Sequence, residues 1–172
     1  MIPSLEQLSA RLAPLAGPMP VAAPPVAGTA APVPAPPRSP VQPTDFAARG
    51  YHLDVMVAPG AVVPAAGILD EDGFALDTIT GVDWIAQNEM EVVYDYFHAA
   101  SPLRIVIRTR VPRDHPELPT ISQVFPGANW HEREAHDFFG LRFLQSHPDH
   151  PEVCKPPLAK PSLRLGDQKR RS

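Results

Sequence analysis

Proline limits what this chain can fold into more than any other residue. The sequence contains 24 prolines among 172 residues, and twelve of them lie in the first 43 positions. Proline breaks the interior of a helix and cannot donate a hydrogen bond within a central strand. Residues 1–45 are therefore predicted to hold only a short helix and a disordered, Pro/Ala-rich linker. The folded domain is expected over residues 46–150, and a basic irregular tail over residues 151–172.

The cysteine count and the charge pattern exclude several classes of protein. The single cysteine, Cys154, cannot form a disulfide framework or, alone, a four-thiolate metal site. No apolar run approaches the length of a membrane span, and the N-terminus lacks the basic segment of a secretory signal. Residues 155–172 hold six basic residues and one acidic residue, with no interleaved aromatic residue. We therefore expect no nucleic-acid binding, and a tail that is solvated or docks on an acidic partner.

The first residues form a short amphipathic segment. Ser4 and Gln7 have the spacing of a capping box, and Pro14 is expected to end the helix. Four leucines follow with helical spacings of 3, 4 and 3, namely Leu5, Leu8, Leu12 and Leu15. A frayed peptide is one interpretation, since so short a helix is marginal alone. We favour a docking helix that folds in a groove of another protein, because a disordered arm offers the leucines no core.

Alternating apolar residues predict the sheet. The segments with this pattern are residues 51–57, 76–84, 90–98 and 103–111. An apolar segment, Gly60 to Leu69, has weak helical spacing between the first two. The expected fold is therefore α+β, with a small, mostly antiparallel sheet of about four strands and flanking helices.

The last two strands predict a hairpin with a definite register. If His98 opposes Leu103, one face is apolar, and Glu91 falls opposite Arg110 on the other face. Acidic and basic residues that meet across strands stabilise a sheet, so we predict this register. The charged face carries a row of arginines, Arg104, Arg108 and Arg110, that is either solvated or turned toward a partner.

A second helix is predicted after the proline-rich loop that follows residue 111. Asn129 and Glu132 have the spacing of a capping box, and Gly140 is a typical helix stop. Within it, His131 and His136 resemble a zinc-protease pair, but they are five residues apart instead of four.

Metal binding by this helix is kept as an alternative. Glu132 and His136 are four apart, and further ligands could come from His147, His150 and Cys154. The other interpretation is that these residues cap the helix and pair along its surface, with Arg133 reaching Asp137. No nucleophile elbow, phosphate-binding loop or dinucleotide fingerprint is present, so the chain does not look catalytic.

Residues 116–149 carry a longer and more specific pattern. Its parts are Pro119-Thr120, Val124-Phe125, Ala128-Asn129-Trp130, Glu132-Arg133-Glu134, Asp137, Phe139-Gly140 and His147-Pro148-Asp149. This pattern resembles the family of the 30-kDa subunit of respiratory complex I, the NADH-quinone oxidoreductase. That family includes the matching subunits of energy-converting, membrane-bound nickel–iron hydrogenases. Val82-Asp83-Trp84 and Val93-Tyr94 also fit, so the resemblance covers about residues 50–150.

The resemblance implies a non-catalytic subunit of a redox complex. Such a subunit packs on the large, 49-kDa or hydrogenase-like subunit, beside a small iron–sulfur subunit. It binds no cofactor itself; iron–sulfur clusters, quinone or a nickel–iron centre belong to the partner subunits. The complex places it peripherally on the cytoplasmic side of the membrane, with only indirect membrane contact.

Eight residues are predicted to form the partner interface: Trp130, Glu132, Arg133, Glu134, Asp137, Phe139, His147 and Asp149. Aromatic and arginine anchors beside charged residues are typical of interface cores. We expect Trp130 to be buried in its own domain and Arg133 to be buried against a carboxylate.

A complex I-type NADH–quinone oxidoreductase is the first hypothesis, and an energy-converting hydrogenase is the close alternative. A small metal-dependent enzyme and a free-standing adaptor are the hypotheses from other classes.

Overall fold

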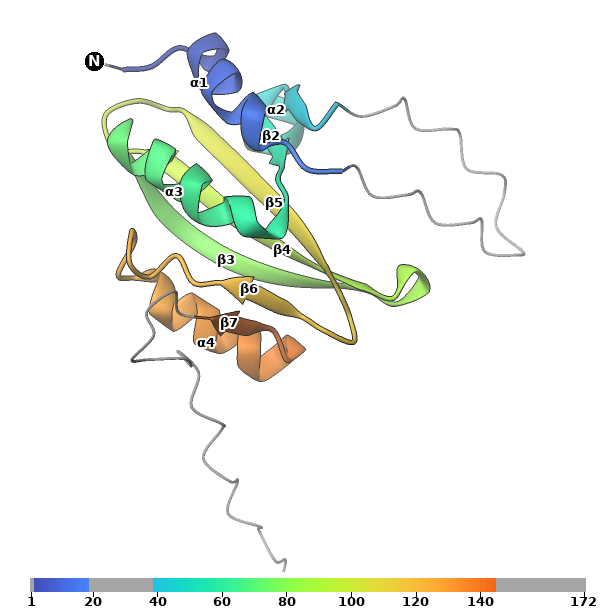
Figure 1. Ribbon diagram of the computed structural model, residues 1–172. Helices are drawn as coiled ribbons and strands as arrows, with labels where there is room; N and C mark the ends of the chain where they lie inside the picture. Colours follow the sequence, from blue (N-terminus) through green and yellow to red (C-terminus); the bar gives the residue numbers. More distant parts are fainter. Residues whose placement is uncertain (1, 19–38, 145–172) are drawn as a thin grey trace, which may run out of the picture.

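A five-stranded sheet forms the centre of the computed structural model, which describes residues 2–18 and 39–144 (Figure 1). Its strands lie in the order β1-β2-β5-β4-β3. They are β1 (Val41–Pro43), β2 (Leu53–Met56), β3 (Phe74–Trp84), β4 (Glu89–His98) and β5 (Arg104–Pro112). All neighbours are antiparallel except β2 and β5, which are parallel. The α+β class with a mostly antiparallel sheet is confirmed.

Helices and one small extra sheet complete the fold. The helices are α1 (Leu5–Leu12), α2 (Phe46–Arg49), α3 (Val62–Glu71) and α4 (Ala128–Phe139). Three short 3-10 turns are η1 (Ala13–Leu15), η2 (Pro59–Ala61) and η3 (Ile85–Gln87). The strands β6 (Glu117–Pro119) and β7 (Arg142–Leu144) pair in parallel beside α4. Figure 1 shows α3 lying across the sheet and α4 at its margin, next to β6 and β7.

The predicted register of the β4–β5 hairpin is confirmed. Glu91 faces Arg110 and Phe97 faces Arg104, and the His98 amide donates to the Leu103 carbonyl at 2.9 Å. The core face of the hairpin is fully buried, with Val92, Tyr94, Tyr96, Ile105, Ile107 and Thr109 each at most 1 % exposed. The alternation of the sequence therefore positions the sheet against its helices as expected.

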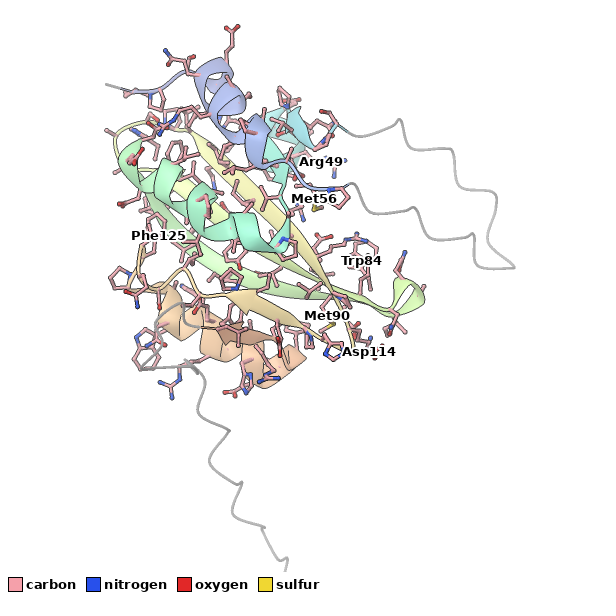
Figure 2. All side chains as sticks on the ribbon, in the orientation of Figure 1. Arg49, Met56, Trp84, Met90, Asp114 and Phe125 are labelled. Carbon is pink, nitrogen blue, oxygen red and sulfur yellow. The ribbon has the colours of Figure 1, made fainter. Side chains whose placement is uncertain are left out.

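The arginine row on the opposite face is paired within the sheet. Arg108 contacts Asp54 at 2.9 Å and Glu91 at 3.0 Å, and Arg110 contacts Glu91 at 2.8 Å. Trp84, labelled in Figure 2, donates its indole N–H to Glu91 at 3.1 Å. Its ring lies 4.4 Å from the Arg110 guanidinium. The carboxylates of the same sheet therefore neutralise these arginines, and no anion from another molecule is needed.

The core extends further toward the N-terminus than the sequence predicts. The strand β1 lies within the predicted linker and pairs with β2, so the fold begins before residue 46. A proline at the end of a short edge strand is compatible with pairing, and this is where Pro43 lies.

The helix α1 is part of this domain, so the docking of its leucines on another protein is a wrong prediction. Its capping box between Ser4 and Gln7 is present as predicted. Leu8 and Leu12 are completely buried in the common core, and α1 contacts α3, β1 and β2. Arg11 adds ion pairs to Glu71 and to Asp72 at the end of α3. The groove that receives the leucines comes from residues far away in sequence, which the local pattern cannot reveal.

The chain leaves α1 through a close backbone contact. A Cβ atom at Gly17 would lie 2.5 Å from the backbone nitrogen of Ala58, so only glycine fits there. The Gly17 amide also donates to the Met56 carbonyl at 2.9 Å. These contacts fix the end of the N-terminal segment against β2.

Candidate partner interface on α4

The helix α4 carries most of the predicted interface and differs from the prediction at its start. Its N-cap is Gly127, without a side-chain cap, and Asn129 lies inside the helix. The turn before the helix sets this start, because the Ala128 amide already donates to the Phe125 carbonyl at 2.8 Å. The predicted stop is confirmed: Gly140 ends the helix with a φ of 73°.

Glu132 is an internal anchor, contrary to its predicted place in a capping box and in the interface. Its carboxylate is fully buried and accepts hydrogen bonds from Thr120 Oγ1 at 2.6 Å and from the Ile121 amide at 2.9 Å. Burial raises the pKa of Glu132, while these two hydrogen bonds oppose the rise. Glu132 therefore ties α4 to the segment that follows β6 and is not available to another protein.

The outward face of α4 is the candidate interface. Trp130 is 73 % exposed and Phe138 is 77 % exposed, and Arg133, Glu134 and Asp137 lie exposed between them. The expectation that Trp130 is buried in its own domain is wrong. These five residues share one side of the helix at 100° per residue, and Ala128, Glu132, Ala135 and Phe139 occupy the other. We call this set of five the outer α4 face.

Arg133 belongs to the outer α4 face, and the expectation that it is buried against a carboxylate is wrong. Its guanidinium lies 5.8 Å from the centre of the Trp130 ring. The predicted pairing with Asp137 is not among the ion pairs of the described residues. A cation over an indole leaves its charge available to an acidic group on a partner.

Phe138 takes the outward position that the prediction gave to Phe139. Helical spacing could have shown this, because residue 138 lies two turns from Trp130, whereas residue 139 falls in line with Glu132 and Ala135. Phe139 is half-buried and packs on β3, where a Cβ atom at Gly81 would lie 2.5 Å from its ring. Phe139 therefore holds α4 on the sheet.

Gly81→Ala is expected to destabilise the protein by about 1–3 kcal/mol, because the new methyl group overlaps the Phe139 ring. This outweighs the roughly 0.5–1 kcal/mol that alanine normally gains over glycine inside a strand. Urea unfolding of the full chain measures the effect. Gly67→Ala in α3 is the matched control, since a Cβ atom there meets nothing within 4 Å. Equal or higher stability of Gly81→Ala would contradict this packing.

Glu132 and His136, the two residues of the metal hypothesis that the structure describes, each have a partner within the domain. Glu132 is engaged with Thr120 and Ile121, and His136 Nδ1 lies 2.8 Å from the Leu141 carbonyl oxygen. Over residues 2–18 and 39–144, no three His, Cys, Asp or Glu side chains cluster closely enough to hold a metal ion. The remaining predicted residues, His147, Asp149, His150 and Cys154, lie outside the described residues, as does the basic tail. None of the described helices is long and apolar enough to cross a membrane.

Sequence relatives are oxidoreductase and dehydrogenase subunits. The chain is 36% identical over 101 residues to a subunit of the NADH-quinone oxidoreductase of Roseiflexus castenholzii, covering 56% of this chain and 58% of the relative. It is 35% identical over 92 residues to a subunit of the F(420)H(2) dehydrogenase of Methanosarcina mazei, covering 54% of each. The chain thus spans little more than half the length of these relatives.

A solved structure that resembles this chain also belongs to a respiratory complex. It is a chain of the membrane-bound sulfane sulfur reductase, an archaeal respiratory membrane complex. The TM-score is 0.57 and the identity 27%, over 69% of this chain and 68% of that one. Residues 55–161 also match the family described as respiratory-chain NADH dehydrogenase, 30 Kd subunit. Because this match covers more than half of the sequence, the chain belongs to the family of the 30-kDa subunit of respiratory-chain NADH dehydrogenase.

Proposed function

We propose that this chain is a non-catalytic subunit of the peripheral arm of a complex I-type NADH–quinone oxidoreductase. It packs on the large, 49-kDa or hydrogenase-like subunit and lies near the small iron–sulfur subunit, on the cytoplasmic side of the membrane. Iron–sulfur clusters and quinone bind to those partners, and this chain contributes binding surface. Its family and its relatives among NADH-quinone oxidoreductases support the proposal.

The observation that carries the proposal is the outer α4 face within the family-matching region. Two large aromatic side chains, Trp130 and Phe138, are about three-quarters exposed on one helix, although Trp and Phe gain most from burial. The buried side of the same helix is already satisfied by β3 and by Glu132, so packing in this domain does not explain the outward aromatics. Exposed aromatics beside an arginine are characteristic of the centre of a protein interface.

An energy-converting hydrogenase or a related reductase is the second candidate. The observation that favours it is the likeness to an F(420)H(2) dehydrogenase subunit and to the sulfane sulfur reductase, which are not NADH enzymes by name. In that case the partner would hold a different electron-transfer centre, while the role of this chain as a packing subunit stays the same.

Affinity purification of the tagged full chain from native membranes tests both candidates. NADH-dependent ferricyanide reduction in the eluate is expected for the complex I type, and hydrogen-dependent dye reduction for the hydrogenase type. An eluate with neither activity and no second subunit would contradict the proposal. Tight, stoichiometric zinc or iron in the isolated chain would favour the metal-enzyme hypothesis instead.

The double variant Trp130→Ala/Phe138→Ala is expected to reduce co-purified partner at least about tenfold, since aromatic anchors at an interface centre often exceed 2 kcal/mol each. The melting temperature of the isolated chain should stay close to that of the wild type, because both rings are exposed. Ile85→Ala in η3 is the control: it removes a side chain that is 75 % exposed, on a different element. Equal partner yield in both variants would contradict the assignment of this face.

A further inference from the structure

The two carboxylates on the outer α4 face, Glu134 and Asp137, lie toward the end of the helix where the helix dipole disfavours negative charge. Helices favour acids near their N-terminus and bases near their C-terminus. In α4 the first turn carries no acid, whereas Glu134 and Asp137 lie in the C-terminal half, with Asp137 in the last turn. Within the described part of the chain neither carboxylate has an ion-pair partner. No ion pair among the described residues therefore offsets the unfavourable position of these two acids in the helix.

This arrangement contrasts with the charged residues of the outer sheet face. On the outer sheet face, Arg104, Arg108 and Arg110 all have carboxylate partners. Charged residues that are unfavourably placed in a helix and have no ion-pair partner in their own domain are expected where a protein meets a ligand or a partner. Glu134 and Asp137 lie between Trp130 and Phe138, which are about 12 Å apart along the helix axis. The acids and the aromatic anchors therefore form one continuous surface.

We propose that the surface receiving α4 is a positively charged protein surface. Lysine or arginine side chains lie opposite Glu134 and Asp137, and apolar pockets on either side accept Trp130 and Phe138. This inference rests on the proposed function and specifies the chemistry of the partner. Nucleic acid and anionic membranes do not fit the surface, because their phosphates would face the two carboxylates. Arg133 at the edge, beside Trp130, calls for an acidic group at that end of the partner.

Charge reversal tests the inference in the full chain. Glu134→Lys/Asp137→Lys is expected to lower the yield of co-purified oxidoreductase subunits at least about tenfold, because like charges then meet across the interface. Glu6→Lys/Asp70→Lys makes the same change in net charge on α1 and α3, at two exposed acids outside the α4 surface, and should leave the yield unchanged. Circular dichroism of both isolated variants checks that they fold.

A neutral pair of substitutions gives a second measurement. In Glu134→Gln/Asp137→Asn the attraction is lost without repulsion, so the partner yield should fall less than on charge reversal. Its dependence on salt should also be weaker than that of the wild type, since salt screens only the charged interface.

The outcomes separate this inference from the function on which it rests. A wild-type yield for Glu134→Lys/Asp137→Lys, together with a loss for Trp130→Ala/Phe138→Ala, would overturn the basic partner and leave the proposed function intact. If the wild-type chain captures no oxidoreductase subunit, or only a second copy of itself, both proposals fail.

Discussion

Glu132→Ala is expected to lower the free energy of unfolding by about 2–4 kcal/mol. The substitution leaves the Ile121 amide and the Thr120 hydroxyl without their buried acceptor, and it opens a cavity beneath α4. Removing a desolvated carboxylate returns part of this cost, since burial itself disfavours the charge. Urea unfolding followed by circular dichroism measures the change. Little or no loss would mean that Glu132 does not hold the helix.

Two variants make the interpretation specific. Glu132→Gln keeps the shape and one carbonyl acceptor, so its loss should be about half as large or smaller. Glu134→Ala is the matched control, because it shortens the same residue type on the exposed side of the same helix. It should change stability by less than about 0.5 kcal/mol. Equal effects of Glu132→Ala and Glu134→Ala would show that burial is not the cause.

The pH dependence of this residue has a definite sign. The pKa of Glu132 is raised in the folded protein, chiefly by burial, above its ordinary value of 4.5. The folded state therefore holds this proton more tightly, and the contribution to stability is fully present below pH 4.5. It is lost as pH rises from there through the folded pKa. The stability difference between wild type and Glu132→Gln should accordingly be largest at low pH and shrink toward neutrality.

Glu132 also illustrates which part of the interface the sequence could predict. The Glu-Arg-Glu motif identifies the correct helix, but it does not say which member points inward. Helical spacing contains that information, since residues 128, 132, 135 and 139 form one stripe that is otherwise apolar. A charged residue in such a stripe is easily taken for a surface residue, because buried carboxylates are rare. What the sequence cannot supply is the pair of donors, which come from Thr120 and Ile121 in a different segment.

The fold predictions are correct where neighbouring residues determine the structure and fail where it depends on residues far apart in the sequence. The β4–β5 register follows from alternation and from acid–base pairs across a short connection, and both are visible in the sequence. The strand β1 escapes sequence-based prediction because it lies in a proline-rich context and is only Val41–Pro43. Its pairing depends on β2 being in place, which no local pattern reports. The parallel pairing of β2 with β5 is likewise fixed by packing across the chain.

Leu8→Ala/Leu12→Ala is expected to have the largest effect on stability, at least about 4 kcal/mol, since each buried leucine truncated to alanine costs about 2–5 kcal/mol. Both side chains are completely buried in the core that α1 shares with α3, β1 and β2. Alanine is the best helix former, so the loss reports packing and not helix propensity. For a domain with a typical stability of about 5–15 kcal/mol, the variant should be largely unfolded at moderate urea concentrations.

Matched substitutions on the same helix separate packing from surface effects. Glu6→Ala removes an exposed side chain of α1 and should change stability by less than about 0.5 kcal/mol. Arg11→Ala removes the ion pair with the exposed Glu71 and the ion pair with the mostly buried Asp72. Because the Arg11 side chain is itself partly exposed, the loss of stability should be about 1 kcal/mol or less. The order of the three losses is therefore predicted as well as the size of the largest.

This measurement also decides between the two roles that a leucine stripe at the N-terminus can have. A helix that served only another protein would lose partner binding in Leu8→Ala/Leu12→Ala while the domain kept its stability. If the helix completes this domain, the variant must first lower the stability of the domain, and any loss of assembly follows from unfolding. Because the leucines, the Arg11 ion pairs and the Gly17 contact all join α1 to this chain, the second result is expected. An unfolding curve that coincides with that of the wild type would return α1 to the role of a docking helix.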